Sequence, residues 1–100
     1  MFSVANVKPR YFEFQQPGGD NVLKIEPPKL KTLNRMNDLS RPDSTPKEAA
    51  EVVARVIAKN KEHRKITADT VMEWMDMDQM AGFVLDFVSW LSNEKKNDPN

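Results

Sequence analysis

The stretch that decides the fold is MAGFVLDFVSWL, residues 80–91. Placed on a helix, its polar residues reduce to one stripe, Gly82, Asp86 and Ser89, which Asn93 continues one turn later. These residues are four, three and four positions apart, so they share one face. A surface helix of a globular protein normally buries one apolar stripe and exposes the rest. This helix is apolar over most of its circumference, and we predict that it is covered on more than one side.

The composition describes one small domain. The chain has 100 residues, with 15 basic and 15 acidic side chains and a formal net charge of zero, and this length allows a single modest core. A protein that binds nucleic acid through bulk charge needs a basic face, so the balance argues against that class. The lack of cysteine excludes disulfides and thiolate chemistry. The N-terminus does not read as a signal peptide, and Asp86 interrupts the one stretch that approaches a membrane span.

The first part of the chain carries strand and turn signals. Residues 10–15 alternate as in a strand, with Phe12 and Phe14 on one side. The segment 17–21, PGGDN, is typical of a turn, and residues 22–25 alternate as a return strand. We therefore predict a β-hairpin. Because two strands alone are marginal in water, the hairpin has to pack on the helices or pair with another chain.

Helical periodicity begins after the hairpin. Apolar residues recur every three positions in the segment 30–39, which indicates a short helix or 3₁₀ turn. Residues 45–48, TPKE, combine a capping box with proline at the first helical position. The apolar positions that follow predict a helix, which Asn60 and the charged residues after it should end.

Two further helices are expected. Thr67 can cap the first of them, with Asp69 placed favourably for the helix dipole in the first turn. The segment 75–78, MDMD, indicates a short break before the last helix. Asp76 or Asp78 can cap that last helix, which then contains the apolar stretch.

These signals predict a mainly α fold with a small N-terminal β-hairpin, an α+β arrangement with about three to four helices. Residues 1–39 hold the hairpin and a short helical segment, residues 40–45 a linker, and residues 46–93 a helical domain. The polar residues 94–100 form a tail that should fray.

The sequence carries no catalytic or metal-binding pattern. The one histidine, His63, lies in the segment KEHRK, where the cationic surroundings oppose metal binding, so we interpret it as an exposed loop residue. Asp76 and Asp78 lack the glycine and the bidentate glutamate of a calcium loop, and helix capping explains them better. The glycine pair in the turn precedes a strand, so it forms no phosphate cradle. We expect no enzyme activity, no cofactor and no metal.

Methionine and aromatic residues gather in the last third of the chain. Any one of them could fill a small core, but the helices facing them offer mainly alanine and valine. Not every large side chain can then find an internal partner, and an apolar patch beyond a few hundred Å² usually marks an interaction site. We therefore predict partner binding or self-association through Met75, Met80, Phe83, Phe87, Trp90 and Leu91.

Six short segments, spread over nearly the whole chain, carry a family resemblance. They are VKPRYFEF (7–14), PPKLKTL (27–33), EAAEVVAR (48–55), KNK (59–61), TAD (67–69) and DQM (78–80), the last leading into the aromatic-rich helix. Together they resemble the tail assembly chaperones of long-tailed, siphovirus-like bacteriophages and prophages.

This resemblance implies a non-enzymatic protein of the bacterial host cytoplasm that is absent from the mature virion. Members of the family coat the long tape-measure protein before the tail tube polymerises around it. Many are made in two forms, and the longer form, a product of ribosomal frameshifting, is thought to recruit tail-tube subunits; this chain looks like the short form. The implied partners are the tape-measure protein and, through a longer form, the tail-tube protein. No nucleic acid or membrane is expected, and a homo-oligomer stays open.

Two other classes also stay open. A small helical nucleic-acid-binding regulator would use the charged segment 59–65, KNKEHRK, and it predicts steeply salt-dependent binding to duplex. An oligomeric structural tail protein would be found in purified virus particles. A repeated-base run near the stop codon, opening onto an overlapping reading frame, would favour the chaperone.

Overall fold

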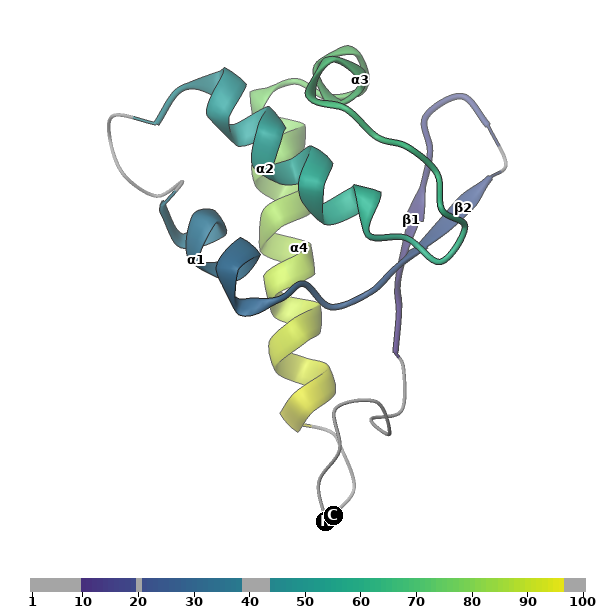
Figure 1. Ribbon diagram of the computed structural model, residues 1–100, viewed down its shortest axis with the longest axis vertical. Helices are drawn as coiled ribbons and strands as arrows, with labels where there is room; N and C mark the ends of the chain where they lie inside the picture. The colour runs from purple at the N-terminus through teal and green to yellow at the C-terminus, as the bar shows by residue number, and fades with distance from the viewer. Residues whose placement is uncertain (1–9, 20, 39–43, 97–100) are drawn as a thin grey trace.

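The computed structural model describes residues 10–19, 21–38 and 44–96, with side chains as far as residue 92. It confirms the mainly α fold with an N-terminal hairpin. Most of the expected linker and the end of the expected tail lie outside the described residues. The elements, in chain order, are β1 (Phe12–Gln15), β2 (Val22–Ile25), α1 (Leu30–Asp38), α2 (Pro46–Ala58), α3 (Ala68–Trp74) and α4 (Met77–Lys96) (Figure 1).

β1 and β2 form an antiparallel two-stranded sheet. Phe12 pairs with Ile25 and Phe14 with Leu23. Gly18 in the turn has a φ of +72°, a backbone conformation that glycine adopts without steric cost. The two phenylalanines of β1 are partly buried while the polar residues that alternate with them are exposed, as the sequence pattern predicts.

The loop after α2 covers the outer edge of β2. The Lys24 carbonyl accepts a hydrogen bond from the Lys61 N–H at 2.9 Å, and the Lys24 N–H donates to Glu62 Oε1 at 2.9 Å. Inside this loop the buried Asn60 side chain accepts from the Arg64 N–H at 2.7 Å and donates to the Arg64 carbonyl at 3.0 Å. The hairpin is therefore fastened to the C-terminal end of α2, and the polar backbone of β2 is satisfied on both edges.

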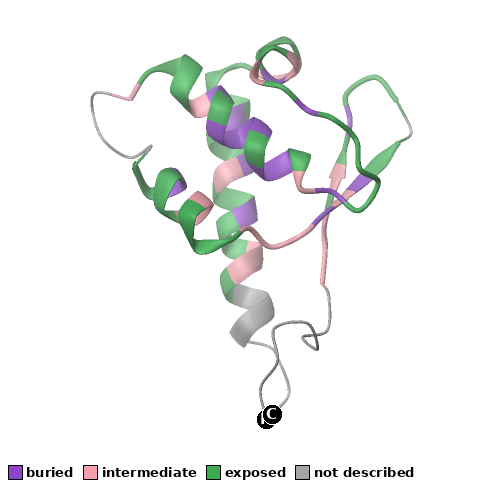
Figure 2. Cartoon of the chain, viewed as in Figure 1, coloured by how far each residue is buried: buried purple, intermediate pink, exposed green. Residues whose placement is uncertain are grey.

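α2 lies at the centre of the fold and is built from small side chains. α1, α3, α4 and β2 all pack against it, and Figure 2 shows that its middle turns are buried. The helix begins with the predicted cap, because Thr45 Oγ1 accepts from the Glu48 N–H at 3.1 Å and Pro46 follows in the first turn. The buried residues of α2 are Ala50, Val52, Val53, Ala54, Val56 and Ile57.

The last two helices begin where the sequence predicts. Thr67 caps α3 by accepting a backbone N–H of the first turn. At the start of α4, Asp76 Oδ1 accepts from the Gln79 N–H at 2.8 Å and Gln79 Oε1 accepts from the Asp76 N–H at 2.9 Å. This reciprocal pair satisfies two N–H groups, so the first of the two candidate aspartates is the cap. α4 continues to Lys96, past the expected end near residue 93.

One hydrophobic core joins the hairpin to the helices. Leu23 and Ile25 of β2 belong to the same cluster as Met36 of α1 and Phe87 of α4. The segments that the sequence divides into residues 1–39 and 46–93 thus contribute to a single core in the described structure.

Candidate protein-binding groove

One side of α4 packs against the hairpin through aromatic rings. The Phe12 ring centre lies 5.2 Å from that of Phe87 and 5.9 Å from that of Phe83, and the Phe14 ring centre lies 5.6 Å from that of Phe83. All three pairs meet edge to face, an arrangement that aromatic quadrupoles favour. Phe87 is fully buried, and Met80 and Phe83 nearly so. These three residues, predicted to contact a partner, belong to the core of the single chain.

The other three predicted residues, Met75, Trp90 and Leu91, are partly buried against the core. The Trp90 ring centre lies 5.6 Å from that of Phe12 on one side and 4.6 Å from the guanidinium carbon of Arg10 on the other. Arg10 Nη2 donates to the Leu91 carbonyl at 3.4 Å, while its Nη1 is buried and has no acceptor in the described part of the chain. The six predicted residues are therefore not gathered on one exposed surface, although Met80 and Leu91 each line a recess beside α4.

The apolar residues that α4 exposes most are not among the six residues that the sequence predicts to contact a partner. Met77, Leu85 and Val88 are 54%, 69% and 43% exposed, and Ala81 is exposed between them. The spacing of these four residues along α4 places them on one helical face. We call them the aliphatic stripe. Their spacing can be read from the sequence, but the larger aromatic residues nearby gave the stronger apolar signal.

A groove separates the aliphatic stripe from α1 and α2. Its upper recess, of about 360 Å³, lies beside Met77 and Leu85 and is walled by Met36 of α1 and by the N-terminal half of α2. Its lower recess, of about 420 Å³, lies beside Val88 and is walled by Met36 and Leu33 of α1. Both recesses are lined by Met36 and by successive turns of α4, and we call the two together the groove.

Charged side chains of opposite sign stand near the two ends of this groove. Asp78 is exposed in the first turn of α4 and lies seven residues before Leu85, on the same side of the helix. Arg10 lines the lower recess together with Leu91. Neither Asp78 nor Asp86 lines a recess; Asp78 lies on the side of α4 that carries Leu85, whereas Asp86 is exposed on the polar stripe.

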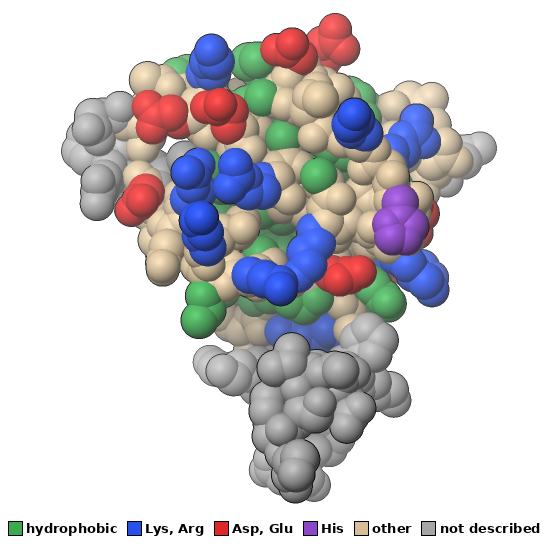
Figure 3. Space-filling model, in the orientation of Figure 1, with side chains coloured by type: hydrophobic (Ala, Val, Ile, Leu, Met, Phe, Trp, Pro, Cys, Tyr) green, Lys and Arg blue, Asp and Glu red, His purple; other side chains and the backbone are tan. Residues whose placement is uncertain are grey.

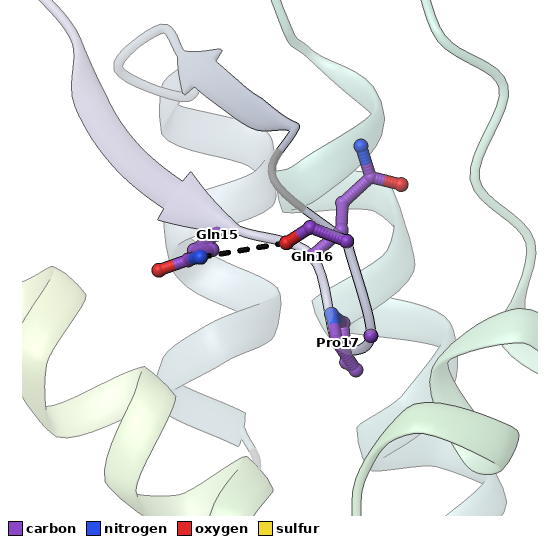
Figure 4. A pocket seen from close by; sticks show the side chains of 5 residues that line it. Gln15, Gln16 and Pro17 are labelled. Atoms are coloured by element: carbon purple, nitrogen blue, oxygen red, sulfur yellow. Dashed lines mark hydrogen bonds between the residues drawn. The ribbon is translucent and has the colours of Figure 1, made fainter.

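A recess of about 550 Å³ lies in the hairpin turn and is lined by residues 15–19. Figure 4 shows the side chains of Gln15 and Gln16 pointing in different directions; Gln15 Nε2 donates to the Gly19 carbonyl at 3.4 Å. Gln16 is buried, and its Nε2 has no acceptor in the described residues. None of the described side chains that line this recess is ionisable.

The loop that contains His63 has a structural role in the fold. His63 is exposed, as predicted, with a φ of +59° in the left-handed region. The hydrogen bond from the Lys24 N–H lowers the pKa of the neighbouring Glu62 from its ordinary value of 4.5. Within the ranges that the structure describes, no group of three or more His, Cys, Asp or Glu residues could hold a metal ion.

Basic and acidic side chains share the face drawn in Figure 3, with hydrophobic side chains showing between them. Among the helices of the described segments, none is both long and apolar enough to cross a bilayer. The apolar groove beside α4 is the feature of the described surface on which we base a proposal. Comparison of the chain with family models, curated proteins and solved structures finds no match in any of the three.

Proposed function

We propose that the chain is a phage tail assembly chaperone, which binds apolar helical segments of the tape-measure protein and keeps them from aggregating. The observation that carries the proposal is the exposure of Met77, Leu85 and Val88 along a groove that α1 and α2 leave open. The family resemblance of the sequence supports the identity of the partner, and the groove supports the mode of binding.

The dimensions of the groove suit one helix of a partner. The aliphatic stripe spans twelve residues of α4, 77–88, whose ends lie about 16 Å apart at the rise of an α-helix. An amphipathic helix buries side chains at positions i, i+3, i+4 and i+7 in such a groove. Three methionines, Met36, Met77 and Met80, line the upper recess. Because methionine is flexible and polarisable, this wall can adapt to partner helices of different sequence.

A long helical protein with apolar segments aggregates through them unless they are covered. Many copies of a small domain, each covering a few helical turns, would protect the tape-measure protein until the tail tube assembles. In this proposal the chain acts in the bacterial host cytoplasm and leaves before the virion is complete. Recruitment of tail-tube subunits would fall to a longer form of the chain.

Co-expression with the tape-measure protein of the same phage or prophage tests this proposal. We expect a tape-measure protein that is insoluble alone to become soluble and to be captured with the chain. Leu85→Asp places a charge in the exposed stripe and should abolish both effects without unfolding the chain. Asp86→Lys, one residue away on the polar stripe, is the matched control and should leave both effects intact.

Persistent insolubility of the tape-measure protein, or capture that Leu85→Asp leaves unchanged, would contradict the proposal. A structural tail protein is the second candidate, since the same stripe can pack on a second copy of the chain. If the chain is a structural tail protein, light scattering should show a stable oligomer that Leu85→Asp dissociates. The chain should also be found as a component of purified virus particles.

A further inference from the structure

The groove differs chemically from one end to the other. Between its ends its walls are mainly apolar, supplied by Met36, Val53 and Val84 among others. Near its upper end Asp78, which does not line the recess, is exposed in the first turn of α4, and its spacing places it beside Leu85 of the aliphatic stripe. At its lower end the guanidinium of Arg10 is part of the wall. A partner that follows the groove therefore meets a negative charge near one end and a positive charge at the other.

The positive charge of Arg10 has no carboxylate partner in the described chain. Its guanidinium lies on Trp90, one nitrogen donates to a main-chain carbonyl at 3.4 Å, and Nη1 has no acceptor. A hydrogen bond of 3.4 Å is long for this pair of atoms, and a guanidinium forms its strongest contacts with carboxylates. The stacking on Trp90 also fixes the guanidinium before a partner arrives.

We propose that the groove selects amphipathic helices whose apolar face is bracketed by charge, with a carboxylate at Arg10 and a lysine or arginine at Asp78. This inference rests on the proposed function and specifies the chemistry of the helix that the groove takes. The order of the two charges in a partner sequence then sets the direction in which the partner lies along α4.

The separation of the two charges sets their spacing in the partner. Asp78 lies thirteen residues before Leu91, whose carbonyl accepts a hydrogen bond from Arg10. This corresponds to about 20 Å along a helix, a distance that joins residues about 13 to 14 positions apart in a partner helix that lies alongside α4. Residues 14 apart are again on the same face, since they are close to four full turns from each other.

Three labelled helical peptides of 18 residues test the inference through fluorescence anisotropy. They share one leucine and alanine face and differ at two positions 14 residues apart, which carry Lys and Glu, Gln and Gln, or Lys and Lys. We expect the Lys/Glu peptide to bind the full chain about tenfold more tightly than the Gln/Gln peptide, as charge-assisted contacts require. The Lys/Lys peptide should lose this advantage, because its second lysine meets Arg10.

Matched variants of the chain locate the effect. Arg10→Gln and Asp78→Asn should each reduce the preference for the Lys/Glu peptide over the Gln/Gln peptide, while Arg10→Lys, which retains the charge, should keep part of it. Arg35→Gln in α1 and Asp86→Asn on the polar stripe alter exposed charges that do not flank the aliphatic stripe, and they should change nothing. Thermal unfolding of each variant shows whether the fold is intact.

The outcomes separate this inference from the function on which it rests. The chain could bind the Lys/Glu and Gln/Gln peptides with equal affinity, and Leu85→Asp could abolish the binding of both. That result would overturn the proposed selection by charge, but the groove would remain a helix-binding site. A preference that Arg10→Gln and Asp78→Asn leave unchanged in a folded chain would overturn it too. If no peptide binds and Leu85→Asp leaves tape-measure capture unchanged, both the inference and the proposed function fail. A stable dimer that excludes the peptides would assign the groove to a second copy and overturn the inference.

Discussion

The two long sides of α4 are both apolar, yet they have different fates in the fold. The side that carries Phe83 and Phe87 is covered by the phenylalanines of β1. The side that carries Leu85 and Val88 faces a groove and remains exposed. The larger aromatic rings of α4 thus pack within the chain, and the smaller aliphatic side chains remain exposed, where a partner can contact them. In a small domain, the apolar residues that remain exposed identify an interaction surface better than the largest ones do.

The largest expected effect comes from truncating the covered side. Phe87 is 0% exposed and contacts the rings of Phe12, Phe83 and Trp90. Phe87→Ala should lower the free energy of unfolding by about 3–5 kcal/mol, because it removes a buried ring and leaves a cavity. Leu85→Ala, on the exposed side of the same helix, should change it by less than about 1 kcal/mol. Urea unfolding of both variants measures the contrast, and equal losses would show that the two sides do not differ.

A second variant acts on the covered side through the support of the hairpin. Asn60 is 4% exposed, and its side chain forms three hydrogen bonds with backbone groups of Ile57 and Arg64. Asn60→Ala should cost about 2 kcal/mol, since it leaves buried backbone groups without partners. Asn34→Ala, at an exposed position of α1, is the control and should stay within about 0.5 kcal/mol. A loss for Asn60→Ala no larger than that of the control would mean that this loop does not hold the hairpin in place.

The smallest expected effect depends on pH. The Lys24 N–H holds the pKa of Glu62 below its ordinary value of 4.5, so the ionised form is favoured in the folded state. Its stabilising contribution is present above pH 4.5 and is lost as the pH falls through the lowered pKa. Glu62→Gln should therefore lower Tm slightly at neutral pH, with a difference from the unaltered chain that narrows on acidification. A difference in Tm between Glu62→Gln and the unaltered chain that widened in acid would contradict the assignment.

Local signals in the sequence are sufficient for most elements of the fold. The caps at Thr45, Thr67 and Asp76 are short-range hydrogen-bonding patterns, and the hairpin follows from the alternation and the glycine turn. The partition of α4 into covered and exposed sides is not local, because it depends on where the hairpin packs. In the sequence, the alternation of residues 10–15 places Phe12 and Phe14 on one side of their strand. This pattern indicates that the aromatic residues of α4 can find aromatic partners within the chain.

The groove was harder to predict for a related reason. Its walls come from α1, α2 and α4, and its openness depends on how α1 and α4 are both held by α2 without closing on each other. The periodicity of the sequence shows that α4 has more apolar residues than a single buried stripe can contain. It does not show which side of α4 is left uncovered by the other elements. Arg10 also gave no signal, since its role depends on contact with Trp90 at the far end of the chain.

The contacts between β1 and α4 also have a consequence for the order of events during synthesis. Arg10 and Leu91, which are joined by a hydrogen bond, are 81 positions apart in the sequence. The Phe12 ring of β1 likewise packs against the aromatic rings of α4. Chains emerge from the ribosome N-terminus first, so β1 is made long before the helix that covers its rings. Such distant contacts slow folding relative to a bundle of neighbouring helices. The hairpin can therefore reach its native packing only after α4 has been synthesised.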